Sequence, residues 1–466
     1  MKKTISISLI ASALLFGANS DVTTLTTDYE NTIQGASTID ASTVNQGKTD
    51  VTGSTVLNVD LLKNTTGNMI DNVDIEGGST VNQARFIITD SNASSSTANG
   101  ISIKSANTIQ NSEIRDASNV KQTYTEITGG STVQALNLEY TNIIEDVSSD
   151  SSEINASTIS QGILIVNGAS EVTDFTQLTI RNTMQDVDAN DANLTQNSII
   201  VTNGSTVTDF DNEDGATSPD ATNSMINVTA TNGAKISQNT NTFDNSTIDG
   251  LRTKQANSIE NLTLDTNSIV QGNIEVTGSE VKDFDVEFTN KISDVTITGA
   301  GTTEQGVLIV TDSNGTGDAD ADTLDIKAVN TLVNTDLDTS NIVQSKTSLI
   351  GSTGRAIVSG LTLDHTNTIQ NSDASDATIR DNNATRATIS QAETTITDST
   401  VTGMTQTFVN LVQQAEIADS TLSQGQTVIT NSDVTALTMT QTNTVANSSI
   451  KNSSTVTQGS TTILGN

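Results

Sequence analysis

Few residues of this chain are of the types that perform catalysis or hold a metal ion. There is no cysteine, and His365 is the only histidine. Thiolate metal sites are excluded, and His365 has no second residue of its kind with which to bind a metal or build a triad. Its place in the local pattern is one that apolar residues fill elsewhere, so we interpret it as a substituted core position. Nothing here argues for an enzyme.

Two acidic runs have the residue types of a calcium loop. Asp318, Asp320 and Asp322 alternate as calcium ligands do, but the glycine at the sixth position and the distal glutamate are missing. The run 209–215, which contains five acidic or amide residues and a glycine, matches no better. We therefore expect no cofactor, and calcium binding in these runs would be weak and incidental.

The charge balance excludes one class of partner. Twenty lysines and arginines stand against 55 aspartates and glutamates, a formal net charge of −35. Nucleic-acid binding needs clustered cations, so we expect no nucleic-acid partner. Only 33% of residues are hydrophobic and 2% aromatic, but the apolar residues are regularly spaced and mostly β-branched, which favours strands over disorder.

A glutamine that returns twelve times organises the whole sequence. The gaps run from 33 to 47 residues, a minimum period with insertions, which is typical of stacked repeats. The column could be an internal ladder of amides that hydrogen bond at one-turn spacing, or the glutamine and a following glycine could simply make a good corner. The glutamines are Gln46, Gln83, Gln122, Gln161, Gln196, Gln238, Gln271, Gln305, Gln344, Gln391, Gln424 and Gln458.

Each repeat contains three units of about eleven residues, which predict an all-β fold, a single long β-solenoid. In the second unit Val281, Phe284, Val286 and Phe288 fall at offsets 0, 3, 5 and 7. The last three alternate as a half-buried strand does, and the jump from 0 to 3 requires a bend. The third unit begins with an asparagine that also recurs twelve times. We expect about twelve turns of three faces each.

The ends of the chain and its insertions complete the predicted organisation. Residues 1–20 have the basic start, apolar stretch and small-residue site of a secretory signal. Residues 21–466 form the solenoid, with no membrane span. Insertions rich in Gly, Asn, Asp and Ser predict surface loops near 91–99, 211–222, 312–320 and 345–355.

Most of the scarce aromatic residues belong to the second unit. They could form a carbohydrate-stacking strip, but their parity with valine and leucine favours a stacked core face. They are Tyr29, Tyr140, Phe175, Phe210, Phe284, Phe288 and Phe408.

The two ends of the repeat array are in phase. Residues 20–25, Ser-Asp-Val-Thr-Thr-Leu, closely match residues 432–437, Ser-Asp-Val-Thr-Ala-Leu, and the chain closes on a glutamine unit. A second molecule placed end to end would continue the period. Such a heterologous contact makes filaments.

The predicted secretory signal, the absence of cysteine and the repeats with Gln-Gly and many asparagines resemble bacterial curlin-type fibre subunits and, more broadly, secreted β-solenoid adhesins. The repeats here are longer, with Ser-x₃-Gln spacing and three units. The resemblance implies a secreted or cell-surface protein of a bacterium, in a biofilm matrix, with an outer-membrane exporter as partner. We expect a structural protein that partners itself in a head-to-tail fibre. The alternative is an adhesin rod that binds host or matrix ligands through its inserted loops.

Overall fold

The computed structural model describes the chain outside a set of short stretches. Those stretches are 1–2, 6–8, 11–12, 17–20, 23–24, 29–30, 54, 58, 63–66, 95–100, 148–153, 209–220, 266–267, 299–300, 317–323, 338–340, 352–355, 371–372, 376–387, 414–415, 419, 452–453 and 465–466.

The fold is an all-β solenoid of stacked parallel strands, as predicted. Strands make up 84% of the structure, and the described residues contain no helix. The solenoid has about nine turns, somewhat fewer than the twelve predicted, while twelve strands carry the twelve recurring glutamines. The chain divides into two compact units, residues 1–239 and 240–466.

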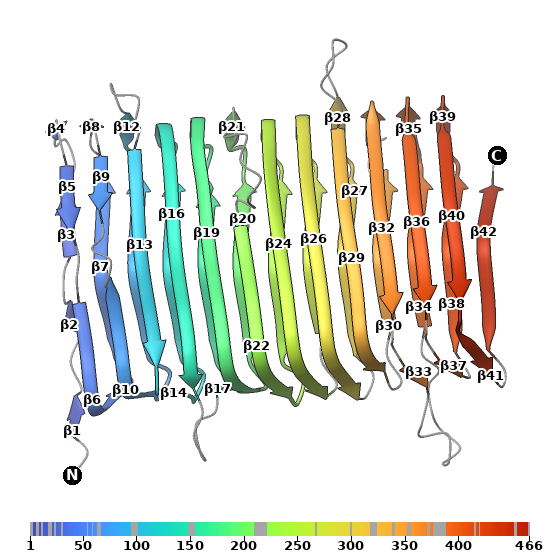
Figure 1. Ribbon diagram of the computed structural model, residues 1–466. Coiled ribbons are helices and arrows are strands. Elements are labelled where there is room, and N and C mark those ends of the chain that lie inside the picture. Colours follow the sequence, from blue (N-terminus) through green and yellow to red (C-terminus); the bar gives the residue numbers. More distant parts are fainter. Residues whose placement is uncertain are drawn as a thin grey trace. The chain divides into compact units, whose positions relative to one another are not determined.

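In the first unit, the strands that carry the glutamines pair with one another and form what we call the glutamine sheet (Figure 1). Its strands are β2 (Leu9–Ile10), β3 (Ala13–Phe16), β7 (Thr43–Thr52), β11 (Thr80–Thr89), β15 (Asn119–Thr128), β18 (Thr158–Val166), β20 (Asn193–Thr202) and β23 (Lys235–Asp244), the last of which contains the unit boundary.

The remaining strands of the first unit form what we call the asparagine sheet. They are β1 (Lys3–Ile5), β4 (Asp21–Val22), β5 (Leu25–Asp28), β6 (Asn31–Asp40), β8 (Thr55–Leu57), β9 (Val59–Leu62), β10 (Asn68–Glu76), β12 (Asn92–Ser94), β13 (Ile101–Gln110), β14 (Glu113–Ile114), β16 (Thr132–Val147), β17 (Ile154–Asn155), β19 (Glu171–Asn190), β21 (Thr206–Thr208) and β22 (Ala221–Thr231).

The second unit repeats this division into two sheets. Its glutamine strands are β25 (Ser268–Thr277), β27 (Thr302–Thr311), β30 (Asn341–Ile350), β34 (Thr388–Thr397), β38 (Thr421–Thr430) and β42 (Thr455–Leu464). Its asparagine strands are β24 (Thr247–Asp265), β26 (Glu280–Thr298), β28 (Asn314–Thr316), β29 (Leu324–Leu337), β31 (Ala356–Ser359), β32 (Leu361–Gln370), β33 (Asp373–Ser375), β35 (Ser399–Thr402), β36 (Thr405–Gln413), β37 (Glu416–Ala418), β39 (Asp433–Thr435), β40 (Thr438–Ala446) and β41 (Ser449–Lys451).

A turn has two sheets rather than the three separate faces that were predicted. The second and third units join in one long strand, as in β26, which pairs with β24 along its length. The pairing skips only where Gly250 faces Asp283 and where Asn261 faces Asp294. Asn261 and Asp294 adopt the left-handed backbone conformation, with φ of 54° and 56°. A single left-handed residue bends the strand without ending its ladder, because neighbours bend at the same place.

The core follows the predicted alternation. In β26 the side chains of Phe284, Val286 and Phe288 are buried, while Asp285, Glu287 and Thr289 are more exposed. Branched and aromatic residues suit these positions because their rigid side chains pack well on a pleated surface.

The predicted loops are shorter than expected. Residues 92–94, 221–222 and 314–316 lie in strands, and the predicted loop near 345–355 overlaps β30 up to Ile350. The remainder of each predicted loop lies partly or wholly outside the described residues. Ser345 follows a glutamine and takes the left-handed bend that glycine takes elsewhere, so its polar composition marks a bend inside a strand.

Candidate assembly interface

The glutamine side chains hydrogen bond to one another along each unit. Each Nε2 donates to the Oε1 of the preceding glutamine, over 2.7 to 2.9 Å, from Gln83 through Gln238 and from Gln305 through Gln458. The interior glutamines are fully buried. A buried primary amide is costly unless it is hydrogen bonded, so each turn satisfies the next.

The asparagines form a second ladder that points the other way. Each Nδ2 donates to the Oδ1 of the following asparagine, over 2.7 to 3.0 Å, from Asn31 to Asn223 and from Asn257 to Asn443. The two ladders lie close together, since Asn182 Nδ2 also donates to the Gln161 backbone carbonyl over 3.4 Å. Because the donors of the two ladders point in opposite directions, an end that offers acceptors on the glutamine ladder offers donors on the asparagine ladder.

The glutamine column also bends the strand. All twelve residues that follow a glutamine have φ between 54° and 68°. At Gly272 a Cβ atom would come within 2.9 Å of the Phe288 ring, so the bend brings the backbone against the opposite sheet. The ladder and the corner, which the sequence left as alternatives, are both features of the same position.

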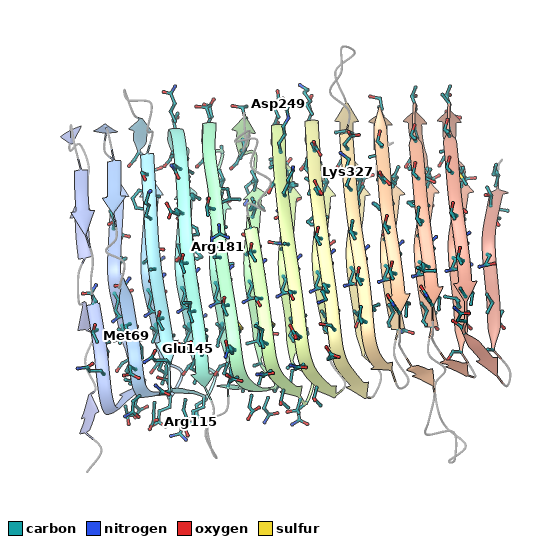
Figure 2. The ribbon with its side chains drawn as sticks, in the orientation of Figure 1. Met69, Arg115, Glu145, Arg181, Asp249 and Lys327 are labelled. Atoms are coloured by element: carbon teal, nitrogen blue, oxygen red, sulfur yellow. The ribbon has the colours of Figure 1, made fainter. Side chains whose placement is uncertain are left out.

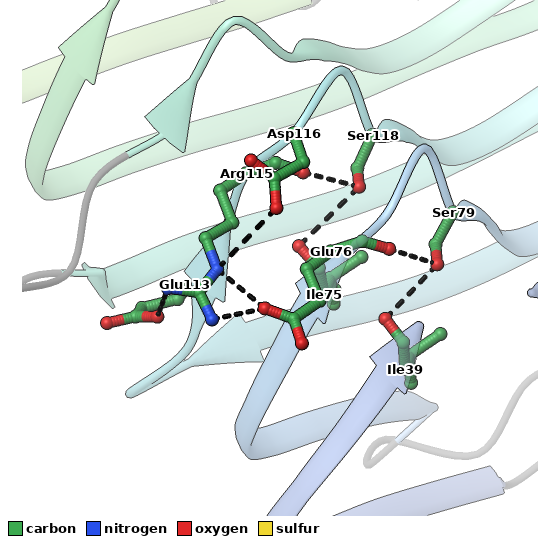
Figure 3. Close-up of polar contacts among 8 residues, drawn as sticks. All are labelled: Ile39, Ile75, Glu76, Ser79, Glu113, Arg115, Asp116 and Ser118. Carbon is green, nitrogen blue, oxygen red and sulfur yellow. Dashed lines mark hydrogen bonds and ion pairs between the residues drawn. The ribbon is translucent and has the colours of Figure 1, made fainter. Parts of the chain in front are cut away.

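Serines hold the corners that precede the glutamine strands (Figure 3). The Ser79 hydroxyl donates to the Ile39 carbonyl over 3.1 Å and accepts from the Ser42 backbone N–H over 3.1 Å. The Ser118 hydroxyl lies 3.5 Å from the Ile75 carbonyl of the preceding turn and also donates to the Arg115 carbonyl within its own corner. These contacts tie successive turns together where the ladder of the sheets is interrupted.

The C-terminal edge of the second unit is uncovered. β42 pairs with β38, β40 with β36 and β41 with β37, and among the described residues no strand pairs with their other edges. Ile463 is 70% exposed, although it continues the column of the buried Ile429. Gln458 and Leu464 are exposed as well.

The N-terminal edge of the first unit is covered. Two short strands lie along β7, with Leu9 opposite Val44 and with Ala13 to Phe16 opposite Lys48 to Val51. Below them Val44, Gln46 and Val51 are buried. The covering strands lie within residues 1–20, which the sequence assigns to a secretory signal.

The other candidate sites belong to the core or fall outside the described residues. His365 is fully buried, and its ring lies 5.4 Å from the ring of Phe408. Burial lowers the His365 pKa to about 3. Tyr140, Phe284, Phe288 and Phe408 are buried, which supports the core reading over a carbohydrate strip. Two acidic runs lie outside the described residues, namely Asp318, Asp320 and Asp322 and the run 209–215. The described residues contain no cluster that could hold a metal ion.

Several basic side chains are engaged on the flanks of the first unit. Arg115 Nε donates to the Glu76 carboxylate over 2.7 Å, and Glu113 lies 3.2 Å away (Figure 3). Lys121 Nζ lies 4.4 Å from the centre of the Tyr124 ring, and burial lowers the Lys121 pKa. Figure 2 shows charged side chains, among them the labelled Arg115, Glu145 and Arg181, spread over the unit rather than gathered at one place. This pattern is that of a solvated flank.

A cavity of about 40 Å³ lies inside the second unit. Its walls are apolar, with Phe284, Leu308 and Leu361 among them, and Ser313 is the only polar residue. A space of this kind stays dry, because water needs several polar partners. It is a packing defect of the core and not a ligand pocket.

Comparison with known proteins gives no family. No family model and no curated protein matches the chain. One solved structure, a mutant of the PL6 family alginate lyase AlyGC, aligns with 93% of this chain and 98% of its own at 9% identity, with a TM-score of 0.11. A score this low carries no argument. No helix long and apolar enough to span a membrane occurs in the described part of the chain.

Proposed function

We propose that residues 21–466 stack head to tail into an extracellular structural fibre. The observation that carries the proposal is the uncovered C-terminal edge, where strands β39 to β42 end without a further partner among the described residues. An open edge of paired strands recruits another strand unless charge, proline or an added segment blocks it. In β42 neither a charged residue nor a proline is present.

The direction of the two ladders supports a head-to-tail contact. At the C-terminal edge the last glutamine, Gln458, offers its Oε1 as an acceptor, because its Nε2 already donates to Gln424. At the N-terminal edge Gln46 offers an Nε2 donor, which bonds to the Asn31 backbone carbonyl over 3.1 Å. A second copy that placed Gln46 on Gln458 would extend the ladder with the same polarity, whereas two C-terminal edges would present like groups.

The register of the repeats supports the same contact. Asp21 and Val22 in β4 pair with β8, and Asp433 and Val434 in β39 pair with β35. Both pairs therefore hold the same place in a turn. Placing β4 on β39 also aligns the asparagine ladder and the glutamine ladder of the two copies, because the spacing from Asn31 to Gln46 equals that from Asn443 to Gln458.

Within this proposal the protein belongs to a bacterial surface or biofilm matrix, leaves the cell through an outer-membrane exporter, and is curlin-like in its use of amide ladders. It acts by assembly and not by catalysis. The adhesin alternative places ligand binding on the inserted loops, much of which lies outside the described residues.

Electron microscopy of purified residues 21–466 at neutral pH tests the proposal. We expect long unbranched filaments with a strand spacing of about 4.7–4.9 Å in fibre diffraction. Addition of calcium should change little. Discrete particles that persist at high concentration would contradict the fibre and would favour the adhesin.

A further inference from the structure

The strands that cover the N-terminal edge occupy the place that the proposed fibre gives to another copy. We call residues 3–16, through their strands β1, β2 and β3, the N-terminal segment. Its strand β2 sets Leu9 opposite Val44, and β3 sets Phe16 opposite Val51. In the second unit the corresponding residues of β42 are Val456 and Ile463, opposite Leu422 and Ile429 of β38.

The correspondence extends through the whole strand. Ile10 and Ala13, opposite Asn45 and Lys48, are separated by two residues, as Thr457 and Ser460 are separated by Gln458 and Gly459. The segment therefore has the spacing of a glutamine strand. Its sequence has alanine and serine in place of glutamine and glycine, so it lacks the amide that would continue the ladder.

The segment also reaches the asparagine sheet. β1 pairs with β6, with Lys3 opposite Ser37 and Ile5 opposite Ile39. In the proposed fibre the β41 region of the preceding copy would lie against this part of β6. One segment thus covers both sheets at the same edge, and Val51 beneath it is 1% exposed.

We propose that the N-terminal segment is an intramolecular cap that blocks fibre growth at this edge until it is removed. The cap rests on the proposed function, since it competes with a second copy of this chain for the edge of β7. Two strands cannot pair with one strand edge at the same time. The uncleaved chain keeps a free C-terminal edge and a blocked N-terminal edge, and it polymerises only after the segment leaves.

This arrangement makes the uncleaved chain a terminator of one filament end. Its β42 can dock on the exposed β7 of a filament built from residues 21–466, and the end then carries a capped β7. The opposite end, which exposes β42, cannot accept the uncleaved chain and continues to accept the shortened one.

The experiment measures growth at each end of surface-bound filaments of residues 21–466, with the polarity marked by a labelled seed. We expect the shortened protein to extend both ends. The full chain alone should extend them at least about tenfold more slowly. Full chain added at one part in ten should stop growth at the end that exposes β7 and leave the other end growing.

A variant of the full chain separates capping from any other effect of the extra residues. L14P/L15P removes two consecutive backbone N–H groups from β3, one of which faces β7 in a parallel pair. It should extend filaments within about twofold of the shortened protein. The matched variant L14V/L15V keeps the strand donors and should remain a terminator.

The outcomes distinguish the two proposals. Failure of residues 21–466 to form filaments would end the proposed function and the cap with it. Filaments from the shortened protein together with equal growth from the full chain would overturn the cap alone. A proline variant that stays as slow as the full chain would also overturn it.

Discussion

Val51 in β7 and Ile463 in β42 occupy the same position of the glutamine strand, yet Val51 is 1% exposed and Ile463 is 70% exposed. Gln46 and Gln458 show the same contrast, since the first is buried and the second exposed. The strands themselves are nearly equivalent. The difference arises from strands β2 and β3, which pair with β7 and have no counterpart on β42 among the described residues. The repeat alone leaves its edges open, and an added segment is needed to close one.

The largest expected effect comes from a charge placed on the open edge. Ile463→Lys in residues 21–466 leaves the monomer folded, because the side chain is exposed there. In a fibre the lysine would be buried against Val51 of the next copy without a partner, which costs several kcal/mol. Seeded growth at the β42 end should fall by at least about tenfold.

The control for this variant is Leu464→Lys, which adds the same charge one residue later. Leu464 continues the column of Thr430 on the outer side of the strand and stays at the surface in the fibre. Growth should change by less than about threefold, as for a surface charge. Equal loss in the two variants would mean that net charge and not the edge is responsible.

The glutamine ladder shows the same contrast, since its interior amides are buried and its last amide is exposed. Gln161→Leu removes a buried amide that bonds to both Gln122 and Gln196. The buried Gln122 Oε1 loses this donor, and Gln196 Nε2 keeps only its bond to the Ser224 carbonyl. In the nonpolymerising Ile463→Lys background we expect the free energy of unfolding to fall by about 1–3 kcal/mol in denaturant titration.

Gln458→Leu is the partner experiment at the exposed end. It should lower the free energy of unfolding by less than about 0.5 kcal/mol, as exposed substitutions do, and it should slow growth at the β42 end. An equal loss of stability from both substitutions would contradict the open edge.

Lowering the pH should destabilise the folded core through the buried His365. His365 has a folded-state pKa of about 3 against an ordinary 6.5, because it is buried as the neutral ring. Below pH 6.5 the unfolded chain binds a proton that the folded chain does not, so stability is lost as the pH falls toward 3.

The matched variant is His365→Leu, which has no such proton. The stability difference between the wild type and this variant should shift by about 2 kcal/mol against the wild type from pH 7 to pH 5, measured in the Ile463→Lys background. A difference that does not change with pH would mean that His365 is not buried as a neutral ring.

The smallest expected effect is that of salt. The full chain carries a formal charge of −35, and residues 21–466, which lack Lys2 and Lys3, carry −37, so copies repel before their edges meet. Raising the ionic strength from about 0.01 M to 0.15 M shortens the screening length from about 30 to 8 Å. Filament growth of residues 21–466 should rise about three- to tenfold, while the capped full chain should remain unable to elongate.

The sequence predicted the parts of this fold that repeat with fixed residue types. The glutamine spacing located the glutamine ladder, and valine and isoleucine alternation located the core. The asparagines were found as a recurring position, but their ladder was not predicted. The bends were harder to predict from the sequence, because the left-handed residue after the glutamine is not always glycine. It is Gly47 in one turn but Ala84 and Thr123 in the next two. The merging of the second and third units was missed, since the asparagine that opens the third unit indicates a corner, whereas Asn290 pairs with Asn257 without a break in the ladder.

The covered edge could not be predicted from composition. A basic start and an apolar stretch indicate a targeting signal, and the same apolar residues also suit a strand. Only the register with β7 shows that residues 9–16 have glutamine-strand spacing. The similarity of residues 20–25 and 432–437 did predict that β4 and β39 hold the same place in a turn.

The most direct test of head-to-tail stacking is a disulfide between copies. The chain has no cysteine, and Lys48 and Ser460 hold the same position of the first and last glutamine strands. Partner residues of parallel neighbours lie within the Cα separation that a disulfide spans, about 4.4–6.8 Å. Residues 21–466 with Lys48→Cys and Ser460→Cys together should give a ladder of covalent multimers on nonreducing gels. A mixture of the two single variants should give dimers only. Dimers formed by Lys48→Cys alone, or no cross-link in assembled material, would contradict the account.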